Sequence, residues 1–156
     1  MGEEKKRLPV GLENFEQIIN DNYYYVDKTG LISELIRNGG MVNLFTRPRR
    51  FGKTLNMSML EHFFSIERDQ SIFEGLEISK DTKLCEEYMG KYPVISISLK
   101  GINAATYEDA FDFAVQIMKN VAGKMQFLLE SDALSDYDKS EYKKLLDSGM
   151  SKAVFC

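Results

Sequence analysis

Residues 46–54 of the chain have the sequence TRPRRFGKT. The last three, Gly52-Lys53-Thr54, match the end of a phosphate-binding loop, in which the lysine reaches the phosphates and the hydroxyl ligates Mg²⁺. The usual loop has a glycine six places before the lysine, and this sequence has Arg47 there. The stretch is therefore either a phosphate site with an altered front half or a basic turn that imitates one.

The front half of this loop has a different chemistry from a glycine-rich loop. Pro48 makes the turn stiffer, because its ring fixes φ near about −65° and it has no N–H to donate to a phosphate. Arg49 and Arg50 can compensate, because a guanidinium binds phosphate through two parallel hydrogen bonds.

The residues on either side of the loop give it the expected setting. Residues 41–46 are mostly apolar and lie between glycines and a proline, which predicts a buried strand. From Lys53 onward, apolar residues recur at helical spacing, namely Leu55, Met59, Leu60, Phe63 and Phe64. A phosphate loop requires this order of strand, loop and helix.

The rest of the sequence predicts more helices and one more strand. Helices are expected over residues 11–19, 28–38 and 81–89, then after a capping box at Thr106 and Asp109, and finally from Asp138 to Leu146. Residues 93–99 are rich in β-branched side chains, which predicts a second strand. Two strands separated by helices indicate a right-handed crossover and a parallel sheet. We therefore predict an α/β fold with parallel strands, flanking helices and an incomplete sheet.

The length of 156 residues suits one domain, although two strands alone do not make a stable sheet. The sequence stops in an apolar stretch over residues 153–156. We therefore expect the front portion of a larger domain, cut before its next strand. If the domain is complete instead, its exposed sheet edge should pair with another copy of the chain.

Composition narrows the class of protein. The net charge of −4 excludes a protein that binds polyanions over its whole surface, so a basic function has to be local. Cys85 and Cys156 lack metal-ligand spacing, which predicts two free thiols. The single histidine, His62, is expected at a helix surface or the edge of the core. No signal peptide or apolar run of about 20 residues is present, so we expect a cytoplasmic protein without a membrane partner.

Three stretches resemble, in this order, the bacterial AAA-ATPase-like family. They are YYVDKTGLISELIRNGG at 24–40, LFTRPRRFGKTLNMSMLEHFF at 44–64 and YPVISISLKGI at 92–102. That family carries a YVDKT element upstream of a TRPRRFGKTLN loop, which replaces the glycine-rich one. The resemblance runs from about residue 8 to about residue 146. It implies one partial P-loop NTPase-type domain over residues 1–156, without the nuclease-like domain that many members carry near their C-terminus.

The resemblance also implies which residues hold ATP or ADP. Those expected around the phosphates are Arg50, Phe51, Gly52, Lys53, Thr54 and Leu55, with Arg49 added for its own chemistry. Thr54 is the expected Mg²⁺ ligand through its hydroxyl. Asp27 and Lys28, in the YVDKT element, are expected near the nucleotide, although Asp27 also fits a plain helix N-cap.

The acidic half of a hydrolytic site is absent from the predicted strands. Residues 92–99 lead into Lys100 and Gly101 rather than into an aspartate that helps to hold Mg²⁺. Family members place a strand that ends in an Asp-Glu pair further along the chain. We therefore expect nucleotide binding with little or no hydrolysis by this chain alone.

Two other functions remain open at this point. The first is a nucleic-acid or anion-binding module that uses Arg47, Arg49, Arg50 and Lys53. The second is an interaction module that uses the fold without any nucleotide.

Overall fold

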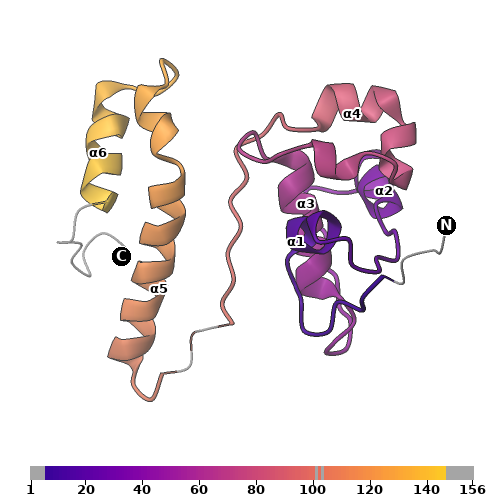
Figure 1. Cartoon of the computed structure of the whole chain (residues 1–156). Helices are drawn as coiled ribbons and strands as arrows, with labels where there is room; N and C mark the ends of the chain where they lie inside the picture. The colour runs from indigo at the N-terminus through magenta and orange to yellow at the C-terminus, as the bar shows by residue number, and fades with distance from the viewer. Residues whose placement is uncertain (1–5, 101, 103, 147–156) are drawn as a thin grey trace. The chain divides into compact units, whose positions relative to one another are not determined.

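The computed structural model describes residues 6–100, 102 and 104–146. The chain divides into two compact units, the first ending at Val94 and the second beginning at Ile95, and each is described by itself (Figure 1). The described elements of the first unit are α1 (Phe15–Asn20), α2 (Gly30–Asn38), α3 (Lys53–Phe64), the 3₁₀ helices η1 (Ser71–Phe73) and η2 (Glu77–Lys80), and α4 (Thr82–Tyr88).

The core of the first unit forms around the apolar face of α3. Met59 and Phe63 on this helix are fully buried, and they pack in one cluster with Phe15 of α1 and Ile32 of α2. Phe73 of η1 closes the cluster, with its ring 5.1 Å from that of Phe15 and 5.4 Å from that of Phe63. The predicted helix face is confirmed, because the buried side chains of α3 recur at the spacing of about 3.6 residues per turn.

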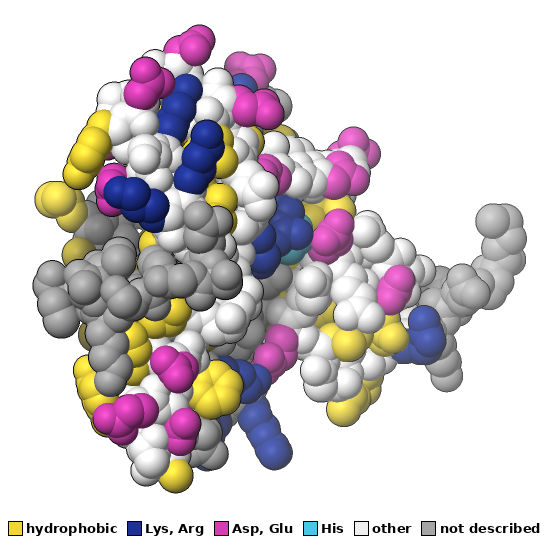
Figure 2. Space-filling view, turned by 90° about the vertical axis from the view of Figure 1, so that its left-hand side faces the viewer, with side chains coloured by type: hydrophobic (Ala, Val, Ile, Leu, Met, Phe, Trp, Pro, Cys, Tyr) yellow, Lys and Arg dark blue, Asp and Glu magenta, His cyan; other side chains and the backbone are white. Residues whose placement is uncertain are grey.

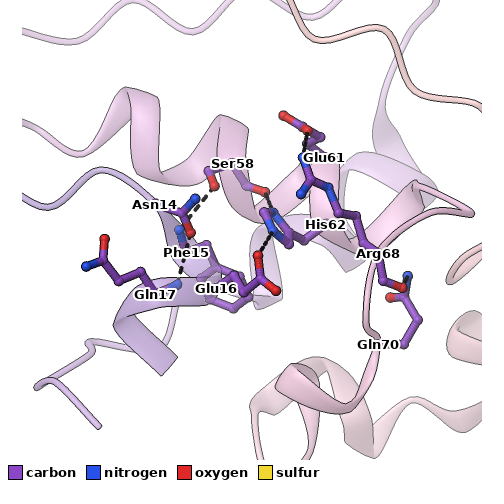
Figure 3. A network of polar contacts seen from close by, with 9 residues as sticks. All are labelled: Asn14, Phe15, Glu16, Gln17, Ser58, Glu61, His62, Arg68 and Gln70. Carbon is purple, nitrogen blue, oxygen red and sulfur yellow. Dashed lines mark hydrogen bonds and ion pairs between the residues drawn. The ribbon is translucent and has the colours of Figure 1, made fainter. Parts of the chain in front are cut away.

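A polar network ties α1 to α3 beside this core (Figure 3). The Phe15 N–H donates to Ser58 Oγ at 3.1 Å, which holds the first turn of α1 against the middle of α3. The imidazole of His62 is 2% exposed, so it is buried rather than at the helix surface. Its Nδ1 donates to the Ser58 carbonyl oxygen at 2.7 Å, and its Nε2 lies 3.2 Å from Glu16 Oε2. The histidine therefore links the two helices.

The second unit is a pair of helices. It contains α5 (Tyr107–Lys124), the 3₁₀ helix η3 (Gln126–Glu130) and α6 (Asp136–Leu146), with α5 and α6 side by side in Figure 1. The Tyr142 hydroxyl on α6 donates to the Ala122 carbonyl oxygen on α5 at 2.7 Å. This bond joins the two helices near the C-terminal end of α5.

The starts of α1, α5 and α6 follow capping side chains in the sequence. The predicted capping box is confirmed, because Thr106 Oγ1 accepts from the Asp109 N–H at 3.1 Å at the start of α5. The last helix begins at Asp136 rather than Asp138, because Ser135 Oγ accepts from the Asp138 N–H at 3.2 Å. The first helix begins at Phe15, later than predicted, since the side chain of Asn14 caps it there.

The prediction of an α/β fold with parallel strands is wrong for this structure. The described residues are mainly helical, and their β pairing amounts to an isolated parallel bridge between Ser65 and Tyr92. Residues 41–46 and 93–99, which were expected as strands, have no regular secondary structure. The physical reason is that β propensity reflects packing on a pleated surface, and neither segment has a neighbouring strand among the described residues.

Both of these segments keep apolar side chains at the surface. Val42 and Leu44 are 88% and 85% exposed, and Ile95 and Leu99 are 64% and 67% exposed. Hydrophobic side chains also stand among charged ones of both signs on the face drawn in Figure 2. The described residues contain no sheet, so they provide no sheet edge through which the chain could self-associate. Self-association itself stays a prediction.

Other expectations concern residues at the chain end and possible membrane spans. Cys85 is a free thiol, as predicted, whereas Cys156 and the apolar stretch at 153–156 lie outside the described residues. None of the helices in the described part of the chain is long and apolar enough to cross a membrane.

The buried ring of Phe63 gives a test of this core. We expect Phe63→Ala to lower the free energy of unfolding by about 3 to 5 kcal/mol, because it leaves a cavity beside Phe64 and Phe73. Urea unfolding followed by circular dichroism measures the change. Phe113→Ala is the matched control, since this ring on α5 is 49% exposed. Equal losses in the two variants would contradict the described core.

Candidate functional site

The loop before α3 turns through two left-handed residues. Arg50 has φ 67°, and Gly52, at the N-cap position of α3, has φ 73°. A glycine adopts this backbone without strain, whereas an arginine there is strained by about 1 to 3 kcal/mol. The N-cap of α3 has no side-chain hydrogen bond, so no capping side chain covers the first N–H groups of the helix. These groups and the positive end of the helix dipole favour an anion.

Lys53 folds back over the loop that precedes it. Its Nζ donates to the Arg47 carbonyl oxygen at 2.6 Å. Arg47 is the residue at the place of the usual first glycine, so the lysine closes a ring from the front of the loop to the start of α3. Lys53 as a whole residue is exposed.

A large open cavity of about 1410 Å³ lies next to the loop. Four parts of the first unit line it: residues 43–51 before α3, the N-terminal part of α3, α2 with the residues just before it, and the η2–α4 region. Six basic residues line this cavity, namely Lys28, Arg37, Arg47, Lys53, Lys80 and Lys83, against three acidic ones, Glu34, Glu77 and Asp81. The surplus of positive charge favours an anionic ligand, although the whole chain is acidic.

One of the basic residues is already paired. Arg37 on α2 forms an ion pair with Asp81, and Asp81 also accepts from the Leu84 N–H to cap α4. The pair therefore joins α2 to α4 across one side of the cavity, and it takes one positive and one negative charge out of the count. The remaining cations still outnumber the remaining acids.

The structure brings some of the predicted site residues to this cavity and leaves others outside it. Lys28, Phe51 and Lys53 line it together with Arg47. Other predicted residues are outside its lining, namely Asp27, Arg49, Arg50, Gly52, Thr54 and Leu55. Of these, Arg49, Arg50 and Thr54 are exposed, and Leu55 packs on the core cluster.

The sequence analysis missed the η2–α4 side of the cavity. Lys80 and Lys83 lie almost thirty residues beyond the loop and belong to no recognisable motif. The available signal was Asp81, whose position before residues 82–89 predicts an N-cap. That signal marks where the helix begins and does not indicate which surface the helix faces.

Asp27 joins the start of α2 to η2. Its Oδ1 accepts from the Thr29 N–H at 2.8 Å and from the Thr29 hydroxyl at 2.7 Å. Its Oδ2 accepts from the Glu77 N–H at 2.7 Å. Thr29 itself is fully buried, and its Oγ1 accepts from the Ile78 N–H at 3.1 Å. The alternative prediction of Asp27 as a plain N-cap is wrong, because Thr29 occupies the N-cap position of α2. Asp27 instead joins two segments about fifty residues apart.

The surroundings of Asp27 set the direction of its pKa shift. Partial burial raises the pKa of the carboxyl group, but the hydrogen bonds from Thr29 and Glu77 and the charge of Lys80 lower it. The net effect holds the pKa of Asp27 below its ordinary value. The contacts therefore stabilise the ionised form of the carboxyl group.

The chain belongs to the family described as predicted AAA-ATPases, whose model matches residues 9–154. It is also 38% identical, over 98 residues, to a protein of Azotobacter chroococcum mcd 1 that is described as an uncharacterized protein in the vnfD 5′ region. That match covers 62% of this chain and 18% of the relative, so the chain spans less than a fifth of the relative's length. No solved structure matches the chain.

The Asp27 contacts predict a pH-dependent contribution to stability. We expect Asp27→Asn to lower the free energy of unfolding by about 1 kcal/mol at pH 7, because an amide nitrogen cannot accept from the Glu77 N–H. Since the folded pKa is depressed, this contribution is present above the unfolded pKa of about 4 and is lost as pH falls through the folded value.

Urea unfolding of the wild type and of Asp27→Asn between about pH 7 and about pH 3 measures this difference. Asp112→Asn, an exposed position on α5, controls for the loss of one surface carboxylate. A difference between wild type and Asp27→Asn that stays constant across this range would contradict the proposed role of the ionised carboxylate.

Proposed function

We propose that this chain binds a nucleoside triphosphate or diphosphate through a variant phosphate-binding loop. The observation that carries the proposal is that Lys53 and Arg47 line a cavity with a surplus of basic residues, directly at the N-terminus of α3. Membership of the predicted AAA-ATPase family supports the same class of ligand.

The loop residues have different tasks in this proposal. Lys53 supplies the mobile cation for the phosphates, and Gly52 lets the backbone approach them closely. Arg49 and Arg50 are exposed on the turn, where their guanidinium groups can reach a phosphate chain that extends out of the cavity. The backbone N–H groups of Thr54 and Leu55, in the first turn of α3, add donors for the anion.

Mg²⁺ fits this arrangement as an ion that arrives with the nucleotide. Among the described residues there is no group of three or more His, Cys, Asp or Glu side chains that could hold a metal. Mg²⁺ keeps several water ligands and commonly takes the rest from one or two protein oxygens and the phosphates. The exposed hydroxyl of Thr54 is the protein oxygen that we propose for it.

The Lys53 ammonium provides the main test of binding. We expect ATP or ADP with Mg²⁺ to raise the melting temperature of the wild type, because a ligand that binds the folded state stabilises it. We expect Lys53→Ala to abolish this rise, since the variant lacks the cation at the N-terminus of α3. A thermal-shift series with ATP, ADP, GTP and phosphate measures it.

Two additions sharpen this thermal-shift test. Lys143→Ala removes an exposed lysine on α6 and should leave the nucleotide-induced rise unchanged. Salt-sensitive binding of DNA or RNA that is indifferent to ATP would favour the alternative anion-binding module instead. Absence of any ligand effect on the wild type would contradict the proposal and favour the interaction module.

Hydrolysis by this chain alone is expected to be slow. Turnover needs an acidic group that helps to hold Mg²⁺ and a group that orients the attacking water. Of the acidic residues that line the cavity, Asp81 is already engaged by Arg37 and by the cap of α4. A phosphate-release assay checks this expectation. Lys53-dependent turnover at about 1 s⁻¹ or faster, an ordinary ATPase rate, would contradict it.

A further inference from the structure

Two phenyl rings outside the core line the same cavity as the cations. Phe51 is 62% exposed and Phe45 is 44% exposed, and neither belongs to the buried cluster around Phe63. Phe15, Phe63 and Phe73, by contrast, are almost fully buried. The cavity therefore combines a cationic side with exposed aromatic surface.

An exposed ring beside a cation implies more than a bare phosphate as the ligand. Leaving a phenyl ring in water forgoes the free energy of burial, about 25 cal/mol for each Å² of apolar surface. An inorganic polyphosphate would satisfy Lys53 and Arg47 but would not cover the ring of Phe51. A ligand that carries an anionic chain and a planar apolar group would satisfy both parts of the cavity.

Phe51 is better placed for this contact than Phe45. It lies two residues before Lys53, so the two Cα atoms are no more than about 7 Å apart. Both side chains line the cavity, so one small ligand can reach the ring and the ammonium together. Phe45 also borders a second, smaller hollow next to α2, and its ring is more covered.

Resting on the proposed function, we propose that the side chain of Phe51 contacts the base of the bound nucleotide and makes the site prefer a nucleotide to an inorganic polyphosphate. The base lies against the phenyl ring, and the phosphate chain extends toward Lys53 and the start of α3. Stacking on an aromatic side chain tolerates any base, so Phe51 selects for the presence of a base rather than for its identity.

The experiment compares two ligands that share the phosphate chain. Isothermal titration calorimetry gives the Kd of the full chain for ATP and for inorganic tripolyphosphate, both with Mg²⁺. We expect Phe51→Ala to weaken ATP binding about tenfold and to change tripolyphosphate binding by less than about twofold. Because Phe51 is exposed on a loop, its removal leaves the core intact.

Two further variants and the possible outcomes decide the inference. Phe51→Trp should restore ATP binding to within about threefold of the wild type, because an indole also stacks on a base. Phe113→Ala, which removes an exposed ring on α5, should change neither Kd. Equal weakening of both ligands, or no weakening of ATP, by Phe51→Ala would overturn the inference while the proposed function stands. Failure of the wild type to bind either ligand would overturn both.

Discussion

The hydrogen bonds that Asp27 accepts are the constraint on which the described cavity depends. One carboxylate oxygen holds Thr29 at the start of α2, and the other holds the first N–H of η2. Thr29 then accepts from Ile78, whose side chain belongs to the core cluster. Through these bonds the YVDKT element sets where the η2–α4 side of the cavity stands relative to α2. The loop before α3 and the first residues of α3, including Lys53, line the same cavity.

Helices could be predicted from the sequence because their signals are local. The start of the helix at Lys53 was predicted to the residue, and the buried face of the helix agrees with the spacing of Met59 and Phe63. Capping side chains gave the start of α5 in the same way. Strands depend instead on a partner elsewhere in the chain. The apolar character of residues 41–46 and 93–99 carries no information on whether such a partner is present, so the prediction of a sheet failed there.

The residues of the candidate site also divide into those with a local sequence signal and those placed by packing between distant segments. Lys53 could be found from the sequence because it lies in a motif with a known chemistry, and Lys28 and Phe51 because they match the family's sequence elements. Arg37, Lys80 and Lys83 reach the cavity through packing between α2, η2 and α4, which no local pattern encodes. Asp27 was singled out because of its position in the YVDKT element. Its carboxylate accepts hydrogen bonds from backbone and hydroxyl donors. A family motif can thus mark a residue that shapes a site without lining it.

The contact between Lys53 and the Arg47 carbonyl oxygen has a consequence for selectivity by charge. The Arg47 carbonyl oxygen, in the same loop, already accepts a hydrogen bond from the Lys53 ammonium group at 2.6 Å. The ammonium group has three N–H donors and this carbonyl oxygen takes one of them. A ligand that takes over this one N–H gains only the difference between two hydrogen bonds. A charged oxygen makes a bond about twice as strong as a neutral one, and it therefore wins this exchange. A neutral oxygen gains almost nothing from it. At this N–H, the contact with the Arg47 carbonyl oxygen therefore favours a charged oxygen over a neutral one.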